Sequence, residues 1–160
     1  MKKIFIFFLL ATPFAVMSQA HSGYTASYSS NFTIADPSYS EKILMLWKDF
    51  ENNTLDNHID MFADTVTMML ASGQVIKGKA ENLAGAKQFR GSLKSYKATV
   101  DAWMSLKCTD RNQNLVCIWG DEVYADKDGK QVKDRLQEVW GFNKDGKIDL
   151  LIQYSAPGGM

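Results

Sequence analysis

From Lys94 onward, apolar and polar residues alternate along the chain, and two turns of similar composition interrupt the alternation. Each turn, Asp-Lys-Asp-Gly at 126–129 and Asn-Lys-Asp-Gly at 143–146, predicts a type I turn followed by a glycine in the left-handed conformation. Alternation broken by such turns is typical of an antiparallel sheet whose strands follow one another in sequence. This feature constrains the fold most, because it commits the second half of the chain to one sheet with one buried face.

The two turns also predict how the strands align. If each glycine forms a bulge, counting outward from the turns places Ile118 and Ile152 opposite Glu138, and Asp121 opposite Arg135. Glu138 then supplies the single carboxylate on a face of the sheet that is otherwise mainly apolar. The apolar and aromatic residues of this face are Val116, Ile118, Leu136, Trp140, Phe142, Ile148, Leu150, Ile152 and Tyr154. We expect helices to cover this face.

The residues between 38 and 91 predict three helices and a short strand pair. Trp47 belongs to the apolar residues that recur at helical spacing in the first helix, and His58 lies beside the apolar stripe of the second. The expected elements are a helix from Ser38, a helix from Thr54, strands over 65–70 and 74–77, and a helix over 78–91. The predicted class is therefore α+β, with three helices packed on one face of a mainly antiparallel β-sheet.

The N-terminus has the composition of a secretory signal. Two lysines precede a mostly apolar stretch over 4–17, which is shorter than the roughly 20 residues that a membrane-spanning helix needs. Small residues at 18 and 20 suit cleavage after residue 20. We therefore expect a signal peptide over 1–20, no stable membrane span, and a secreted or periplasmic protein. The segment 21–37 is rich in Ser, Thr and Tyr and predicts a flexible tether or a loosely docked arm before a domain over 38–156.

Composition excludes several classes of protein. The chain has 18 basic and 18 acidic residues, and this balance argues against nucleic-acid binding, which needs a surplus of Lys and Arg. No His/Cys spacing for zinc is present, and the turn at 126–129 lacks the other ligands of a calcium loop, so we expect no metal and no cofactor.

Export would permit a disulfide between Cys108 and Cys117, but the alternation favours a register that separates them, and both outcomes stay open.

Several stretches resemble the nuclear transport factor 2-like superfamily, in particular its SnoaL-like branch, over about residues 38–156. They are Leu46-Trp47 with Phe50, Asp56, 61–66 (Met-Phe-Ala-Asp-Thr-Val), 75–79 (Val-Ile-Lys-Gly-Lys) and 142–148 (Phe-Asn-Lys-Asp-Gly-Lys-Ile). The resemblance implies a cone-shaped fold in which the sheet is curved, a cavity between this curved sheet and the helices, and frequent homodimers. Related ketosteroid isomerases carry a general-base Asp in the strand after Ala-Asp, whereas 67–70 here holds no carboxylate.

Within that expected cavity, Glu138 is the main candidate for acid/base chemistry, because an apolar pocket would raise its pKa. His58 could share a proton with it. The alternative is that each is a structural residue, Glu138 paired with a donor from a helix and His58 at a helix edge. The other expected pocket residues are Trp47, Ile118, Trp140, Ile152, Tyr154, Asp101 and Glu122.

Two hypotheses of function remain. In the first, an exported SnoaL-like protein binds a small, mostly apolar molecule, either as a binding protein or as a metal-free isomerase, dehydratase or cyclase. In the second, the cavity is filled by the chain's own side chains and the protein is a non-catalytic interaction module. Trp119 and Leu151, predicted on the outer face of the sheet, indicate a homodimer through that face.

Overall fold

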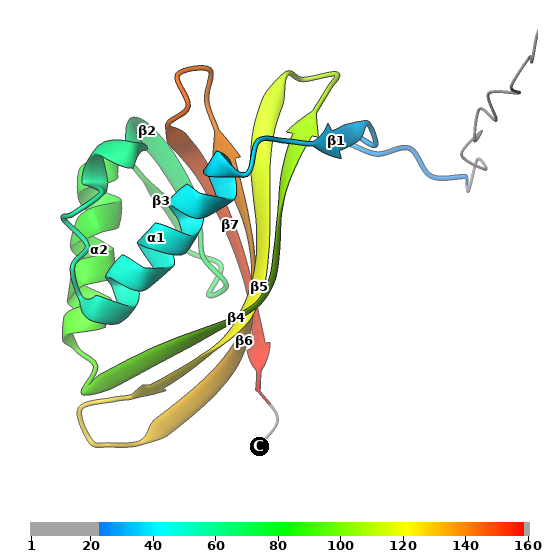
Figure 1. The fold of residues 1–160 in the computed structure, drawn as a ribbon. Helices are drawn as coiled ribbons and strands as arrows, with labels where there is room; N and C mark the ends of the chain where they lie inside the picture. The colour runs from blue at the N-terminus through cyan, green and yellow to red at the C-terminus, as the bar shows by residue number, and fades with distance from the viewer. Residues whose placement is uncertain (1–22, 159–160) are drawn as a thin grey trace, which may run out of the picture.

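A computed structural model describes residues 23–158. These residues form one sheet, two α-helices and a short 3₁₀ helix (Figure 1). In chain order the elements are β1 (Phe32–Ile34), α1 (Ser38–Asn52), η1 (Ile59–Met61), β2 (Phe62–Met69), β3 (Val75–Lys77), α2 (Lys79–Gly91), β4 (Ser95–Cys108), β5 (Gln113–Ala125), β6 (Gln131–Phe142) and β7 (Ile148–Pro157). The signal peptide predicted over 1–20 lies outside the described residues.

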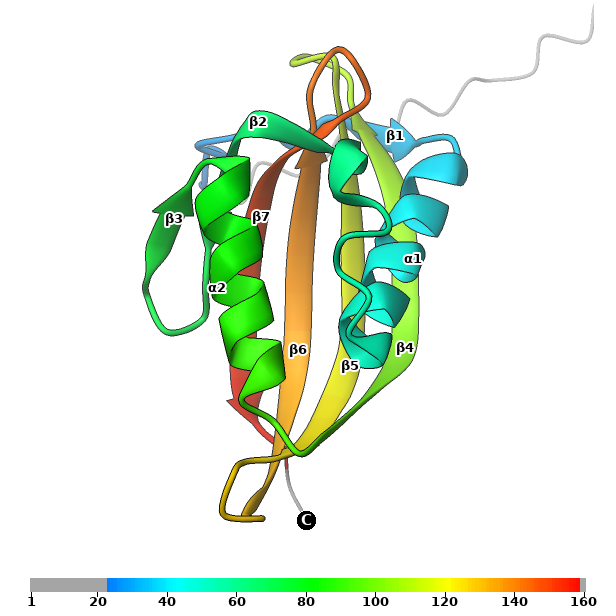
Figure 2. The same ribbon diagram turned by 90° about the vertical axis from the view of Figure 1, so that its left-hand side faces the viewer.

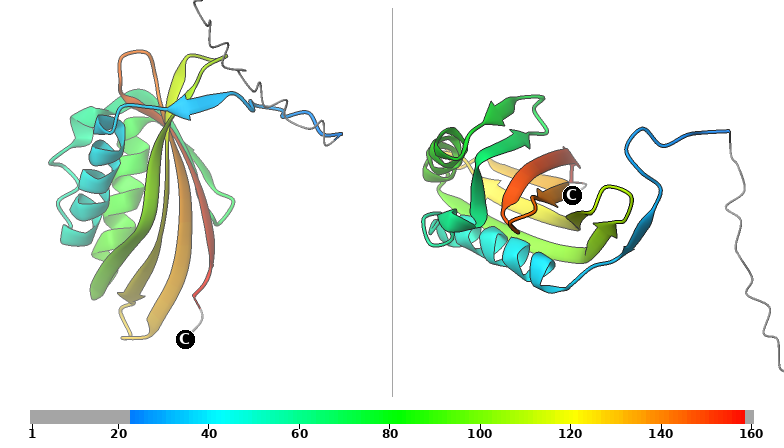
Figure 3. Two further views of the ribbon diagram at one scale, coloured as in Figure 1. Left: turned by 45° about the vertical axis from the view of Figure 1, so that its right-hand side comes forward. Right: turned by 90° about the horizontal axis from the view of Figure 1, so that it is seen from above.

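The seven strands lie in the order β1-β4-β5-β6-β7-β2-β3. β2 runs parallel to β7, and every other neighbouring pair is antiparallel. The sheet is strongly curved, and α1 and α2 both lie on its concave face (Figures 1 and 2). Among the described residues no helix covers the convex face (Figure 3). The predicted α+β class with a curved, mainly antiparallel sheet is confirmed.

The prediction of three helices is wrong, because residues 54–61 form turns and η1 instead of an α-helix. Asn53 ends α1 in the left-handed conformation, with φ of 59°. The Thr54 hydroxyl, expected to cap the second helix, donates to Asp49 Oδ1 over 2.9 Å. The backbone then makes tighter bonds, from Asn57 N–H to the Thr54 carbonyl and from Met61 N–H to the His58 carbonyl. An apolar stripe only eight residues long does not outweigh these local bonds.

The segment 21–37 includes β1, which pairs with the last residues of β4. Next to β1, Ser29 Oγ donates to Asp110 Oδ1 over 2.7 Å, and Arg111 Nε donates to the Tyr28 carbonyl over 2.9 Å. The residues from Tyr28 onward are therefore held at the edge of the sheet beside the β4–β5 turn (Figure 3).

Both glycine turns form as the sequence predicts. Gly129 and Gly146 have φ of 85° and 71°, and each donates its N–H to the residue three positions earlier. The alignment of β5 with β6 is also confirmed, since Ile118 lies opposite Glu138 and Asp121 opposite Arg135.

The alignment of β6 with β7 differs from the prediction by one residue. Phe142 pairs with Ile148 as expected, but Gly141 pairs with Leu150, so Asp149 is a bulge. A Cβ atom on Gly141 would lie 3.0 Å from the Leu150 Cβ and 3.4 Å from Asp149 Oδ1, so the missing side chain leaves room for the bulge. Beyond it every residue of β7 turns to the face opposite the predicted one.

A second irregularity curves the sheet beside α1. The register of β4 with β5 shifts between Val100 and Ala102, opposite Gly120. A Cβ on Gly120 would lie 2.2 Å from the Thr99 carbonyl oxygen and 3.0 Å from the Trp47 ring. Glycine is therefore required where the bent strand and the helix approach each other closely.

The two thiols are free, and the register explains why. Cys108 lies opposite Gln113, whereas Cys117 lies opposite Met104, which precedes Cys108 by four residues on β4. Within residues 23–158, no helix is both long enough and apolar enough to cross a membrane.

Candidate functional site

Glu138 lies at the centre of the concave face, and three donors surround its carboxylate. Trp47 Nε1 on α1 and Trp140 Nε1 on β6 donate to Oε2 over 2.7 and 2.9 Å, and Gln153 Nε2 on β7 donates to Oε1 over 2.9 Å. The side chain is buried, with 4% of its surface exposed. A carboxylate oxygen accepts about two hydrogen bonds. The two indoles therefore saturate Oε2, while Oε1 can accept one more bond.

Glu138 is held without a countercharge. Among the described residues no Lys, Arg or His forms an ion pair with it. Burial raises the pKa of Glu138 above its usual value, and the hydrogen bonds from Gln153, Trp47 and Trp140 oppose that rise in pKa. A group with these properties can accept or release a proton in a site from which water is largely excluded.

A cavity of about 800 Å³ lies beside Glu138, between α1, α2 and the sheet. Most of its wall is apolar or aromatic. Its polar lining residues are Ser72, Gln74, Lys79, Asn82, Gln88, Ser92, Glu122, Glu138 and Gln153. The apolar and aromatic lining residues are Leu46, Trp47, Phe50, Leu55, Ile59, Phe62, Val66, Met68, Leu70, Ile76, Leu83, Phe89, Tyr96, Tyr124, Leu136, Trp140 and Leu151. This combination of an apolar wall with a few placed polar groups is typical of a site for a small molecule.

The structure brings three of the predicted pocket residues into this wall, namely Trp47, Trp140 and Glu122. Ile118 shares the concave face with them but is fully buried in the core.

Three other predicted pocket residues lie outside the wall of this cavity. Asp101 is the bulge residue of β4 and is exposed. Ile152 and Tyr154 point away from the cavity because of the bulge at Asp149, and 56% of Tyr154 is exposed. The same shift buries Leu151, predicted on the outer face, in the core.

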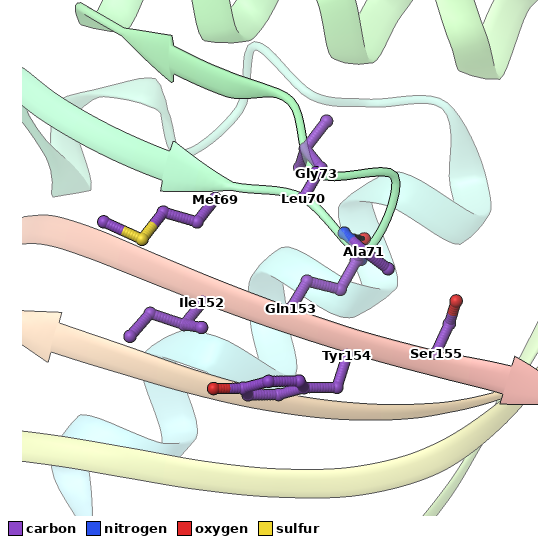
Figure 4. A pocket seen from close by; sticks show the side chains of 8 residues that line it. All are labelled: Met69, Leu70, Ala71, Gly73, Ile152, Gln153, Tyr154 and Ser155. Atoms are coloured by element: carbon purple, nitrogen blue, oxygen red, sulfur yellow. Dashed lines mark hydrogen bonds between the residues drawn. The ribbon is translucent and has the colours of Figure 1, made fainter.

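Gln153 takes the place that the predicted register gave to Ile152. It lies opposite Glu138, and its Oε1 accepts a hydrogen bond of 3.5 Å from the Ala71 N–H on the turn between β2 and β3. Figure 4 shows this side chain reaching toward Ala71, in a second, smaller hollow of about 310 Å³ at the end of the β2–β3 hairpin. Gln153 therefore lines both hollows and connects the Glu138 carboxylate to the hairpin.

His58 does not share a proton with Glu138 in this arrangement. Its Nδ1 lies 2.5 Å from Asp49 Oδ2, and it is absent from the wall of the cavity. Asp49 is buried on α1 and also accepts the Thr54 hydroxyl. The structure thus makes His58 part of the contact that holds the 54–61 turns against α1, as in the structural alternative.

A second carboxylate lines the cavity near the β5–β6 turn. Tyr96 Oη on β4 donates to Glu122 Oε2 on β5 over 2.8 Å. Burial raises the pKa of Glu122, the Tyr96 hydrogen bond lowers it, and the charges of Asp134 and Glu138 raise it further. Burial likewise raises the pKa of Tyr96, so its hydroxyl keeps its proton.

Four aromatic rings surround this end of the cavity. The ring centroid of Phe89 lies 6.3 Å from that of Phe50 and 5.9 Å from that of Tyr124. The centroid of Tyr96 lies 4.9 Å from that of Phe50 and 6.5 Å from that of Tyr124. Each ring thus contacts the next around a closed circuit, which we call the aromatic ring set. It draws one residue each from α1, α2, β4 and β5.

Sequence reasoning missed Gln153, Asp49 and Tyr96. A signal existed for Gln153, because a glycine inside a strand, here Gly141, often marks a bulge. Asp49 and Tyr96 gave no comparable signal, since their partners lie on other elements. Among the described residues no group of three or more His, Cys, Asp or Glu side chains is arranged to hold a metal ion.

Many solved structures share this arrangement of helices and strands. An NTF2-like protein of unknown function from Cytophaga hutchinsonii is 21% identical, with a TM-score of 0.54 over 72% of this chain and 97% of its own. A protein described as a SnoaL-like polyketide cyclase, from a Jannaschia species, is 12% identical, with a TM-score of 0.60 over 77% and 90%. An LEH-like epoxide hydrolase of M. tuberculosis is 13% identical, with a TM-score of 0.59 over 74% and 82%.

The chain has the nuclear transport factor 2-like fold. The resemblance noted in the sequence is confirmed at the level of this fold, and SnoaL-like proteins are among the structures that share it. No protein-family model and no curated protein matches the chain in sequence. The NTF2-like fold hosts unrelated activities, so the function has to be argued from the cavity itself.

Proposed function

We propose that the protein binds a small, mostly apolar molecule in the cavity beside Glu138, and that Glu138 Oε1 accepts a hydrogen bond from this molecule. The observation that carries the proposal is the pair of indoles on Oε2, because they leave Oε1 as the oxygen with free capacity. The neighbours named as a polyketide cyclase and an epoxide hydrolase support a small-molecule site in this fold.

If the protein turns its ligand over, the same carboxylate is the group that moves the proton. A buried glutamate whose pKa is raised can act as a general base toward a hydroxyl or an activated C–H held at Oε1. Isomerisation, dehydration and cyclisation each need such a transfer. Glu138 would act without His58, which contacts Asp49.

A matched pair of probes tests the binding step. 2-Naphthol carries one hydroxyl donor, and 2-methoxynaphthalene has the same rings without it. We expect the wild type to bind 2-naphthol about tenfold more tightly, since a hydrogen bond to a charged group contributes about 1.5–3 kcal/mol. Glu138→Gln should remove this preference and leave the affinity for 2-methoxynaphthalene unchanged, whereas Glu41→Gln, an exposed control on α1, should change neither.

Fluorescence titration of the two naphthalenes measures both affinities. Equal affinities in the wild type, or a preference that survives in Glu138→Gln, would show that Glu138 has no role in recognition. Failure of both probes to bind would contradict the proposal as a whole. Mass spectrometry of the protein purified under native conditions would in addition detect a small molecule that is retained in the cavity.

The competing hypothesis of an interaction module requires a cavity filled by side chains, and a hollow of about 800 Å³ does not support it. We nevertheless propose a homodimer through the convex face, where Trp119, Ile152 and Tyr154 form an apolar surface; Leu151 contributes nothing to it. Sedimentation velocity should show a dimer that Trp119→Glu dissociates. A wild-type monomer at micromolar concentration would contradict this part of the proposal.

Export is the remaining part of the proposal. It rests on the leader over 1–20 and predicts a mature chain that starts at residue 21. N-terminal sequencing of the protein recovered from its native host tests it.

A further inference from the structure

The end of the cavity near the β5–β6 turn combines two features that the proposed function does not use. One is the carboxylate of Glu122, and the other is the aromatic ring set of Phe50, Phe89, Tyr96 and Tyr124. All five side chains line the cavity. We propose that this end of the cavity binds the cationic amino group of the ligand, so that the ligand is a small apolar molecule with a protonated or quaternary amine. This inference rests on the proposed function, because it names the ligand class of the same cavity.

The arrangement of the rings is the first argument. The faces of aromatic rings carry partial negative charge and attract cations, and proteins that recognise quaternary ammonium groups surround them with several rings. In the aromatic ring set, contacts run around the circuit, from Phe50 to Phe89, Tyr124, Tyr96 and back. All four rings line the same end of the cavity, so a cation bound there could contact several of them.

The second argument is the charge balance of the cavity. Both carboxylates in its wall, Glu122 and Glu138, are buried or largely buried, and neither forms an ion pair with a described basic residue. Among the described residues, Tyr96 is the only hydrogen-bond partner of Glu122. Lys79 also lines the cavity, but its ammonium group pairs with the carboxylate of Asp64. A largely apolar cavity with two carboxylates and no unpaired cation among its described wall residues favours a cationic ligand and disfavours a carboxylate.

The charged residues around Glu122 are consistent with this. Asp134 lies opposite Glu122 across the strand pair, and its charge makes that end of the cavity more negative. Among the described residues, Arg90 lies over one of these rings, with its guanidinium carbon 5.8 Å from the Tyr96 centroid. Arg90 is not part of the cavity wall, and it donates to the carbonyls of Phe50 and Glu51 at the end of α1 over 2.9 Å. The guanidinium group of Arg90 is therefore held at the C-terminal end of α1 by these hydrogen bonds.

The two polar ends of the cavity would then have different roles. Glu138 Oε1 accepts a hydrogen bond from the middle of the ligand, and the ring set with Glu122 holds its charged end. A bound amine would supply the countercharge that Glu122 lacks, and it would favour the ionised form of that carboxylate.

Three probes that share a phenylpropyl group test the inference by isothermal titration calorimetry. The first is 3-phenylpropyl trimethylammonium, the second is the neutral hydrocarbon in which carbon replaces the quaternary nitrogen, and the third is the carboxylate 4-phenylbutyrate. We expect the cation to bind at least about tenfold more tightly than the neutral probe, and 4-phenylbutyrate to bind most weakly.

Variants of the cavity then locate the effect. Glu122→Gln and Phe89→Leu should each reduce the ratio of the cationic to the neutral affinity severalfold. Glu41→Gln removes an equal charge from an exposed site on α1 and should leave the ratio unchanged.

The outcomes separate the two proposals. If the neutral probe binds as tightly as the cation, or if the preference for the cation survives in Glu122→Gln, this inference is overturned and the proposal of an apolar cavity stands. If neither probe binds, the proposed function fails, and the inference fails with it.

Discussion

Trp47 on α1 donates its indole N–H to the carboxylate of Glu138 on β6, and this bond of 2.7 Å joins the first helix to the centre of the sheet. Trp140 donates to the same oxygen from the strand itself. An indole can donate but cannot accept, so this pair keeps Oε2 as an acceptor in either protonation state. The orientation of the carboxylate is thereby set before any ligand enters.

The buried carboxylate predicts a pH-dependent stability. Burial raises the pKa of Glu138, so the folded chain keeps its proton to higher pH than the unfolded chain, whose glutamates titrate near pH 4.3. The stabilisation is complete below about pH 4.3 and is lost as the pH rises through the pKa of the folded state. From pH 5 to 8 we expect the wild type to lose stability relative to Glu138→Gln, by about 1.4 kcal/mol for each unit by which the pKa is raised.

Urea unfolding of both proteins across this range measures the difference. Other titrating groups cancel in the comparison, because the glutamine keeps the shape and can still accept from the indoles. A difference that is constant with pH, or a wild type that gains stability over the variant as the pH rises, would show that the carboxylate is ionised in the folded state throughout.

Gly120 predicts a position that does not tolerate a side chain. In Gly120→Ala the new Cβ would overlap the Thr99 carbonyl oxygen and press on the Trp47 ring, so the bent strand or α1 has to move. Overpacking of this kind costs about 1–3 kcal/mol. Thermal unfolding should therefore show a clear loss of stability together with a changed tryptophan fluorescence.

Gly91 provides the control for that experiment. It lies in the last turn of α2, and no atom lies within 4 Å of a Cβ added there. Gly91→Ala should be neutral or stabilise the protein by up to about 1 kcal/mol, since alanine favours the helix. Equal effects at both positions would mean that the close approach to Trp47 does not limit residue 120.

The contact between His58 and Asp49 predicts a loss of stability without a loss of binding. Asp49→Ala removes the acceptor of both His58 and the Thr54 hydroxyl, which should cost about 1–3 kcal/mol in urea unfolding. His58→Gln should leave the affinity for 2-naphthol within twofold of the wild type, because His58 lies outside the cavity wall. A large drop in the affinity of His58→Gln for 2-naphthol would show that His58 contributes to ligand binding.

The sequence alone determined the features that depend on neighbours along the chain. The two Gly turns fix the pairing of the residues that flank them, and β6 follows β5 from the first turn without interruption. For that reason the placement of Glu138 opposite Ile118, on the face covered by helices, could be predicted by counting. The alternation over 94–142 predicted the antiparallel pairing in the same way.

Only the tertiary structure decided which residues meet Glu138 from β7. Residues 148–154 read Ile-Asp-Leu-Leu-Ile-Gln-Tyr, so either register places apolar side chains on the concave face, and the alternation cannot choose between them. The bulge at Asp149 sets the register of β7, and Gly141 leaves room for this bulge because it has no side chain. The ring set near Glu122 was decided the same way, because its energy comes from contacts between separate elements, which exist only after the chain has folded.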